Sequence, residues 1–177
     1  MNVTRILVGQ HRAIEALFEE LAGETRRLAR TRTLSRLTEE LVAHMSGEEA
    51  IFYPAAARVL GPASVPGGKG WQAGPSQVDE HLMLRAQLRR VLATDVRGPA
   101  FQPRFEALRL LFAHHVQAEE NDLFPRLDAA LAAPQLEALG AEVLASRPPV
   151  WAVTAEGHAL IRWNSATMRG VRLPAVR

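Results

Sequence analysis

The sequence predicts an all-α fold: an up-down-up-down four-helix bundle, built as a duplicated helical hairpin, with a short fifth helix and a C-terminal tail. Two observations lead to this prediction. Apolar residues recur at steps of three and four in four separate segments, as they do on the buried face of a helix, and no segment alternates with the period of a strand. One pattern of histidines and glutamates also occurs twice, 70 or 71 positions apart.

The first hairpin is expected to pair a helix that ends near Gly23 with a helix that covers residues 34–55. Glycine commonly follows the last turn of a helix. If the two helices bring His11 and His44 to the same height, the turn falls midway between them, near Arg27. The stripe of the first helix is Ile6 or Leu7, His11, Ile14, Phe18 and Leu21, and that of the second includes Leu34, Leu37, Leu41, His44, Glu48 and Ile51.

The second hairpin is predicted by the same reasoning. Its helices carry stripes over residues 78–92 and 101–119, and Gly98 lies midway between His81 and His115, where a turn is expected. The segment 61–76 contains five glycines and three prolines, so it is a predicted loop between the halves.

The chain after the repeat is divided into two parts. Residues 1–132 are the predicted bundle, and residues 133–177 are a C-terminal extension expected to pack on the bundle or on a partner subunit. A short helix is expected over residues 134–145. The tail, residues 147–177, contains Trp151 and Trp163 and has five arginines against Glu156 alone.

Composition excludes several classes of protein. The chain has 177 residues and no cysteine, so thiolate metal sites, iron–sulfur clusters and disulfides are excluded and any metal must be held by nitrogen and oxygen. No apolar segment is long enough to span a bilayer, and we expect a cytoplasmic protein without a membrane partner. The formal charge is +2, and no basic cluster occurs together with a recognisable nucleic-acid-binding motif. Nucleic acid is therefore not an expected partner.

Each half of the chain offers two histidines and one glutamate in the same order. The segment His44-Met-Ser-Gly-Glu48-Glu49-Ala-Ile-Phe52-Tyr53-Pro54 recurs as His115-Val-Gln-Ala-Glu119-Glu120-Asn-Asp-Leu123-Phe124-Pro125. A further histidine, His11 or His81, precedes each copy by 33 or 34 residues. Residues four apart lie side by side on a helix, so each copy directs an imidazole and a carboxylate to one point.

These residues continue the apolar stripes, so we expect them to face the bundle interior. An unpaired buried carboxylate is costly or takes up a proton, and a bound cation removes that cost. A single histidine on such a stripe is more often a hydrogen-bonded core residue, but a set of six at matched spacing predicts a metal site. The predicted ligands are His11, His44, Glu48, His81, His115 and Glu119.

Neighbouring polar residues are assigned other roles. His114 is expected on a different helix face and His158 lies in the tail, so neither is a predicted ligand. Glu49 and Glu120 follow the ligand glutamates and are expected to lean away, as outer partners of the ligands or as surface groups. Tyr53 is assigned to a hydrophobic wall beside the site, and ligation through its phenol stays open.

This arrangement resembles the hemerythrin-like family, also called the HHE cation-binding domain, over roughly residues 4–130. The resemblance implies a non-haem di-iron centre with two iron ions and an oxo or hydroxo bridge. Zinc and manganese are possible substitutes, because imidazole and carboxylate suit them too. The resemblance further implies that His11 and His44 hold one iron, that His81 and His115 hold the other, and that Glu48 and Glu119 bridge the two.

One position departs from the oxygen-carrying hemerythrins, which have a fifth histidine one turn before the third-helix ligand. Here Gln77 stands four residues before His81. Glutamine is a poor iron ligand, so coordination positions are expected to be open to water, dioxygen, nitric oxide or peroxide. Stable, reversible oxygen carriage is therefore not expected.

Three functions are compatible with such a centre. The favoured one is a module that binds or senses a small diatomic ligand or a redox state, with residues 147–177 as the contact to a signalling partner or within a homodimer. The first alternative is a di-iron enzyme that consumes peroxide or reduces nitric oxide, and the second is iron handling. A non-enzymatic function is favoured because nothing in the sequence provides a substrate pocket or an electron-donor domain. No general acid–base pair, nucleophile constellation or phosphate loop indicates other chemistry.

Overall fold

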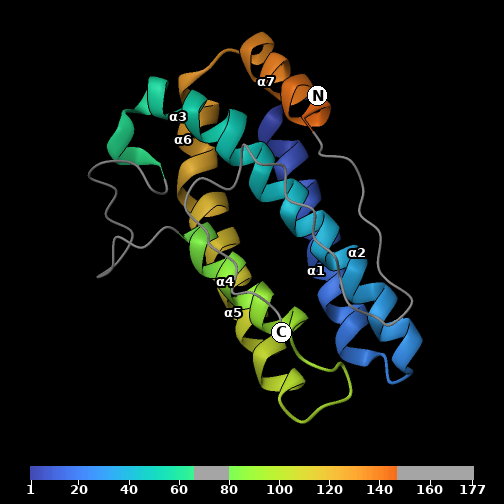
Figure 1. The fold of residues 1–177 in the computed structure, drawn as a ribbon. Coiled ribbons are helices and arrows are strands. Elements are labelled where there is room, and N and C mark those ends of the chain that lie inside the picture. The colour runs from blue at the N-terminus through green and yellow to red at the C-terminus, as the bar shows by residue number, and fades with distance from the viewer. Residues whose placement is uncertain (66–79, 147–177) are drawn as a thin grey trace.

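A computed structural model describes residues 1–65 and 80–146, and every regular element in these ranges is helical (Figure 1). The first half contains α1 (Val3–Gly23), α2 (Arg27–Gly47), the π-helix η1 (Glu48–Phe52), α3 (Tyr53–Leu60) and the short 3₁₀ helix η2 (Pro62–Ser64). The second half contains α4 (Glu80–Leu92), α5 (Phe101–Ala118), the π-helix η3 (Glu119–Leu123) and α6 (Phe124–Ala130), and α7 (Ala133–Ala145) follows.

The predicted bundle of four helices and a fifth short helix is confirmed. The elements α2, η1 and α3 follow one another without a break, and so do α5, η3 and α6, so each run is one long helix with a π-turn inside it. Figure 1 shows α1 beside α2 and α4 beside α5, as two hairpins, with α7 lying across the end of the bundle that holds the N-terminus.

The first hairpin turns slightly earlier than expected. Helix α1 ends at Gly23, as predicted, and residues 24–26 connect it to α2. The side chain of Glu24 accepts hydrogen bonds from the backbone N–H groups of Thr25 and Arg26, at 2.9 and 2.8 Å. This local bonding closes the turn just ahead of Arg27, and nothing in the spacing of apolar residues indicates it.

The turn of the second hairpin and the fifth helix lie close to their expected positions, whereas the second and fourth long helices run on to Leu60 and Ala130, beyond the expected ends at residues 55 and 119. Gly98 lies in the connection between α4 and α5, and α7 begins one residue before the predicted fifth helix. At the start of α1, the Asn2 side chain accepts the N–H of Thr4 at 2.8 Å and so caps the helix. The described part of α4 begins at Glu80, and the expected start of that stripe at Val78 lies outside the described residues.

Helix α7 packs on the bundle at the start of α1. A side-chain carbon at Gly140 would lie 2.4 Å from the backbone oxygen of Met1 and 2.8 Å from Ile6, so only glycine allows this approach. Of the C-terminal extension, residues 133–146 are therefore placed against the bundle. Residues 147–177, with Trp151 and Trp163, lie outside the described residues.

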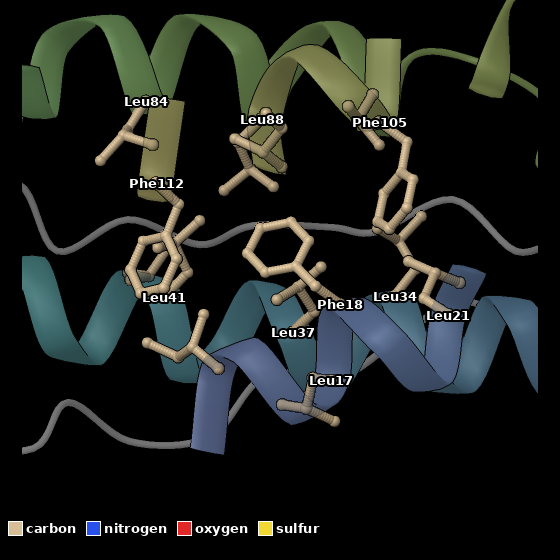
Figure 2. Packing of buried hydrophobic residues seen from close by; sticks show 14 of the residues in the cluster. Leu17, Phe18, Leu21, Leu34, Leu37, Leu41, Leu84, Leu88, Phe105 and Phe112 are labelled. Carbon is tan, nitrogen blue, oxygen red and sulfur yellow. The ribbon is translucent and has the colours of Figure 1, made fainter. Parts of the chain in front are cut away.

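The buried apolar residues form two clusters. The larger one fills the bundle between the two hairpins, with Phe18 of α1, Leu37 of α2, Leu88 of α4 and Phe105 of α5 packed against one another (Figure 2). The smaller one lies toward α7 and includes Leu7, Phe52, Leu123 and Leu136. Across the described ranges, no helix is long and apolar enough to cross a membrane.

Candidate metal centre

The boundary between the two apolar clusters is occupied by polar side chains. In α1, His11 lies between Leu7 of the smaller cluster and Ile14 of the larger one. In the helix formed by α5 and η3, His115 lies between Phe112 of the larger cluster and Leu123 of the smaller one. A layer of histidine and glutamate therefore crosses the bundle between two apolar layers, which exclude water from it.

The structure brings all six predicted ligands together in this layer, and each is at most 2% exposed. One ligand atom from each of five of them lies within 4.8 Å of all the others; the five are His11, His44, Glu48, His115 and Glu119. The sixth, His81, adjoins this group, because its Nε2 lies 3.2 Å from Oε2 of Glu48. The donor set is four imidazole nitrogens and two carboxylates, which suits a transition-metal cation.

The two glutamates stand at the first position of the two π-helices. The N–H of Tyr53 bonds to the carbonyl of Glu48, and the N–H of Phe124 bonds to that of Glu119, so each bond spans five residues instead of four. A proline follows each of these aromatic residues, lacks an N–H, and crowds the carbonyl four residues before it. A wider turn accommodates that ring. Sequence periodicity missed the π-turns, although the repeated aromatic-proline pair was a signal for them.

The histidines are oriented alike, with Nε2 turned toward the centre. The Nε2 atoms of His11 and His44 lie 3.2 Å apart. The Nε2 atoms of His81 and His115 lie 3.2 and 3.7 Å from Oε2 of Glu48. The Nε2 atoms therefore converge from α1, α2, α4 and α5.

The Nδ1 atoms point outward, each toward an oxygen of another side chain. Nδ1 of His11 lies 2.8 Å from Oε1 of Glu120, and Nδ1 of His81 lies 2.8 Å from Oε1 of Glu49. An acceptor at Nδ1 keeps the proton there and leaves the lone pair of Nε2 free for a cation. Glu49 and Glu120 thus act as outer partners of the ligands, which was one of the two roles expected for them.

The other two histidines have partners that sequence reasoning missed. Oε1 of Gln10 lies 3.0 Å from Nδ1 of His44, and Oε2 of Glu80 lies 3.5 Å from Nδ1 of His115. Their positions in the repeat were the available signal, because each is the residue immediately before the first histidine of its half.

Arginines hold two of the outer carboxylates in place. Arg85 donates to both oxygens of Glu49, at 2.6 and 2.7 Å, and Arg12 donates to Oε2 of Glu120. Burial alone would raise the pKa of Glu49, but the hydrogen bonds from His81 and Arg85 outweigh it and hold the pKa at about 2. Glu49 is therefore ionised at neutral pH and draws the Nδ1 proton of His81 toward it.

The pKa values of the two central carboxylates are shifted in opposite directions. Burial, and then the negative charge of Glu119, raise the pKa of Glu48 well above its usual range. Burial acts in the same direction on Glu119, but the nearby imidazoles of His115, His11 and His44 outweigh it and lower its pKa. Within the described residues, neither oxygen of Glu48 meets a hydrogen-bond donor. A buried carboxylate in this state fits a metal ligand, so the donor set and its electrostatics suit a bound cation.

Tyr53 has a polar role in addition to the expected apolar one. Its ring is in the smaller apolar cluster, while its hydroxyl donates to Oε1 of Glu119 at 2.7 Å and lies 3.3 Å from Nε2 of His81. The equivalent residue of the other half, Phe124, stacks on the ring of His11 with a centroid separation of 5.8 Å. The two halves of the site therefore differ at this position.

Of the remaining polar residues named from the sequence, His114 lies in the described part of the chain. The side chain of His114 is 67% exposed and lies beside Oε1 of Glu80, at 3.2 Å, on the outer face of the bundle. His158 and Gln77 lie outside the described residues, so the expected opening at Gln77 stays a prediction.

Comparison with known proteins identifies relatives of the whole bundle. The profile of the hemerythrin HHE cation-binding domain matches residues 2–127. A solved structure with a similar fold is that of a hemerythrin HHE cation-binding domain-containing protein from Mycobacterium kansasii. The similarity covers 82% of this chain and 84% of that one, with a TM-score of 0.65 and 21% identity. No curated protein matches the chain.

Proposed function

The chain belongs to the hemerythrin HHE cation-binding domain family, and on this basis we propose that it is a non-haem di-iron protein that binds or senses a small diatomic molecule or a redox state. The observation that carries the proposal is the buried layer of four imidazoles and two carboxylates, whose free nitrogen and oxygen atoms converge on one centre. Such a layer is costly to bury unless cations occupy it.

The donor atoms suggest how two ions would be shared. His11 and His44 present their Nε2 atoms side by side, and we assign them to one iron. His81 and His115 both approach Oε2 of Glu48, and we assign them to the other. Glu48 and Glu119 lie between the two histidine pairs and are the proposed bridges. When bound, a pair of irons supplies an exchangeable coordination position and two electrons.

The surrounding residues control access and protonation. Apolar side chains above and below the layer, such as Phe112 and Phe52, keep water out and favour an uncharged ligand such as dioxygen or nitric oxide. Glu49 and Glu120 hold the Nδ1 protons of His81 and His11, so these rings keep a single orientation. Arg85 and Arg12 compensate the charge of these outer carboxylates.

A second candidate function is turnover of peroxide or nitric oxide, and the observation in its favour is Tyr53. Burial, and then the charges of Glu119 and Glu48, raise the pKa of this phenol well above its usual range, so it keeps its proton at neutral pH. The proton lies against Glu119, inside the site. A protonated group at this position is what a reaction that consumes protons requires.

Metal analysis and an optical spectrum of protein purified in air test the main proposal. We expect two irons per chain and a visible charge-transfer band. Catalytic loss of peroxide or nitric oxide by the loaded protein would replace sensing by the enzymatic function. Zinc or manganese as the only metal bound in cells would refute the di-iron assignment.

We also propose that residues 147–177 form the contact to a second copy or to a signalling partner. The support is compositional, since this segment contains Trp151, Trp163 and five arginines against one acidic residue. Truncation after Ala145 should change the oligomeric state and leave the metal content intact. Loss of metal on truncation would instead place a residue of this segment, foremost His158, at the site.

A further inference from the structure

Among the side chains that face the Nδ1 atoms of the ligand histidines in the described residues, Gln10 breaks the duplication. The residue before the first histidine of each half is Gln10 in the first half and Glu80 in the second. Each faces the Nδ1 atom of the second histidine of its own half, since Gln10 lies 3.0 Å from His44 and Glu80 lies 3.5 Å from His115. One histidine therefore faces a neutral amide where its equivalent faces a carboxylate.

The Nδ1 partners of the first histidine of each half are the same, a glutamate in both cases. Glu120 and Glu49 lie at the same distance, 2.8 Å, from Nδ1 of His11 and His81. Three of the four ligand histidines thus have a carboxylate oxygen facing Nδ1, at 2.8 Å for His11 and His81 and at the longer distance of 3.5 Å for His115, and His44 has an amide oxygen. Because the first pair is His11 with His44 and the second is His81 with His115, only the second pair has carboxylates behind both rings.

A carboxylate at Nδ1 makes the ring a better donor. Its negative charge attracts the Nδ1 proton and raises the basicity of Nε2, and replacement of such an outer partner typically weakens metal binding by about 10–100-fold. The amide of Gln10 fixes the ring of His44 equally well, because its oxygen must face the Nδ1 proton. The amide carries no charge, however, so it orients the ring of His44 without raising the basicity of its Nε2 atom.

We infer that the two metal positions are unequal and fill in order, the His81–His115 position first, and that Gln10 is the residue that weakens the His11–His44 position. The inference rests on the proposed two-metal site and adds a specificity-determining residue to it. A weaker, more electron-poor position beside a stronger one gives a pair in which one ion exchanges more readily than the other.

The order of filling is tested on the unaltered full-length protein, without iron. Zinc is added stepwise to metal-free protein with ¹⁵N-labelled histidine, and the ring nitrogens are followed by NMR. The first equivalent should shift the signals of His81 and His115, and the second those of His11 and His44. Simultaneous movement of both pairs, or the reverse order, would overturn the inference. A protein that takes up no zinc, cobalt or iron would instead refute the proposed function.

Two variants test whether Gln10 and Glu80 set the difference between the two metal positions. Q10E should strengthen the second zinc-binding step by roughly tenfold and leave the first unchanged. E80Q should weaken the first step by a similar factor, so that the two steps merge. Glu106→Gln is the matched control, because within the described residues Glu106 hydrogen-bonds to Gln102 and Arg109 on the outer face of α5, away from the histidines. The inference is wrong if Q10E leaves the second step unchanged while the ring of His44 still responds to zinc.

Discussion

Oε1 of Glu49 lies 2.8 Å from Nδ1 of His81, although the two residues belong to different halves of the duplicated chain. The relationship is repeated in the other direction, because Glu120 lies at the same distance from His11. Each half of the chain therefore supplies the outer carboxylate for the first histidine of the other half. The two hairpins are joined through the buried layer of histidine and glutamate as well as through the apolar core.

Removal of this carboxylate should weaken metal binding without unfolding the protein. We expect Glu49→Ala to lower the affinity for zinc about 10-fold or more, because His81 loses the acceptor that orients its ring. Competition with a chromophoric chelator measures the change. Glu120→Ala should have a similar effect through His11, and an unchanged affinity in both variants would contradict the assigned role.

Glu48→Gln should separate the stability of the metal-free protein from its metal binding. In the metal-free fold, burial and the charge of Glu119 raise the pKa of Glu48, so a neutral amide at this position should not lower the melting temperature. With metal, occupancy at both positions should fall together, because Glu48 is the proposed bridge. Metal analysis and calorimetry measure the two effects, and retention of two tightly held ions would exclude bridging.

Metal removal should lower the melting temperature. A cation that binds only the folded chain stabilises it by about 4 kcal/mol when its concentration is about 1,000 times its dissociation constant. For a chain of this size, that corresponds to a shift on the order of 10 °C. Thermal melts with and without chelator measure it, and equal melting temperatures would count against a central site.

The metal-free protein should lose stability as the pH falls below about 6.5, the usual pKa of histidine. Burial, and then the neighbouring histidines, hold the pKa of His44 well below that value, and burial also lowers the pKa of His81. Below this pH the unfolded chain binds more protons than the folded one. The free energy of unfolding therefore decreases as the pH decreases, by up to about 1.4 kcal/mol per pH unit for each histidine. Glu48, with its raised pKa, opposes this trend between about pH 4.5 and its folded value.

Two measurements resolve the opposing contributions. Urea unfolding of the metal-free protein from pH 7.5 to pH 5 should show the loss of stability, because two histidines oppose one glutamate. In Glu48→Gln the opposing group is gone, so the loss should be steeper. A stability that is flat in both proteins would show that these histidines have the same pKa in the folded and the unfolded chain.

Phe112→Ala should affect stability and metal binding together. The ring of Phe112 is buried and lies against His11, His44 and His115, with centroid separations of 5.9, 6.1 and 6.1 Å. Its truncation should cost about 3–5 kcal/mol and also weaken metal binding, since three ligand rings lose packing. Phe105 is equally buried in the same helix but contacts Phe18 and Phe101, so Phe105→Ala should cost stability alone.

The sequence by itself determined the helical fold and the composition of the layer of histidine and glutamate. The spacing of apolar residues and the repeated pattern of histidines and glutamates were sufficient for this. A residue such as His115 must face the bundle interior if it continues the apolar stripe of Leu108 and Phe112. Residue type indicated that α1 ends at Gly23, and a fifth helix was expected after the repeat, over residues 134–145. These features depend on neighbours within a single helix, which spacing along the chain records.

The tertiary structure decided which atoms of the layer meet and what lies behind them. Helical rotation suggested that Glu49 points away from the ligand Glu48. Only the position of α4 beside η1 brings His81 to Glu49. Gln10 and Glu80 went unassigned for the same reason, since each acts on a histidine of a neighbouring helix. Such contacts depend on the distance and rotation between helices, and the periodicity of one helix contains neither quantity.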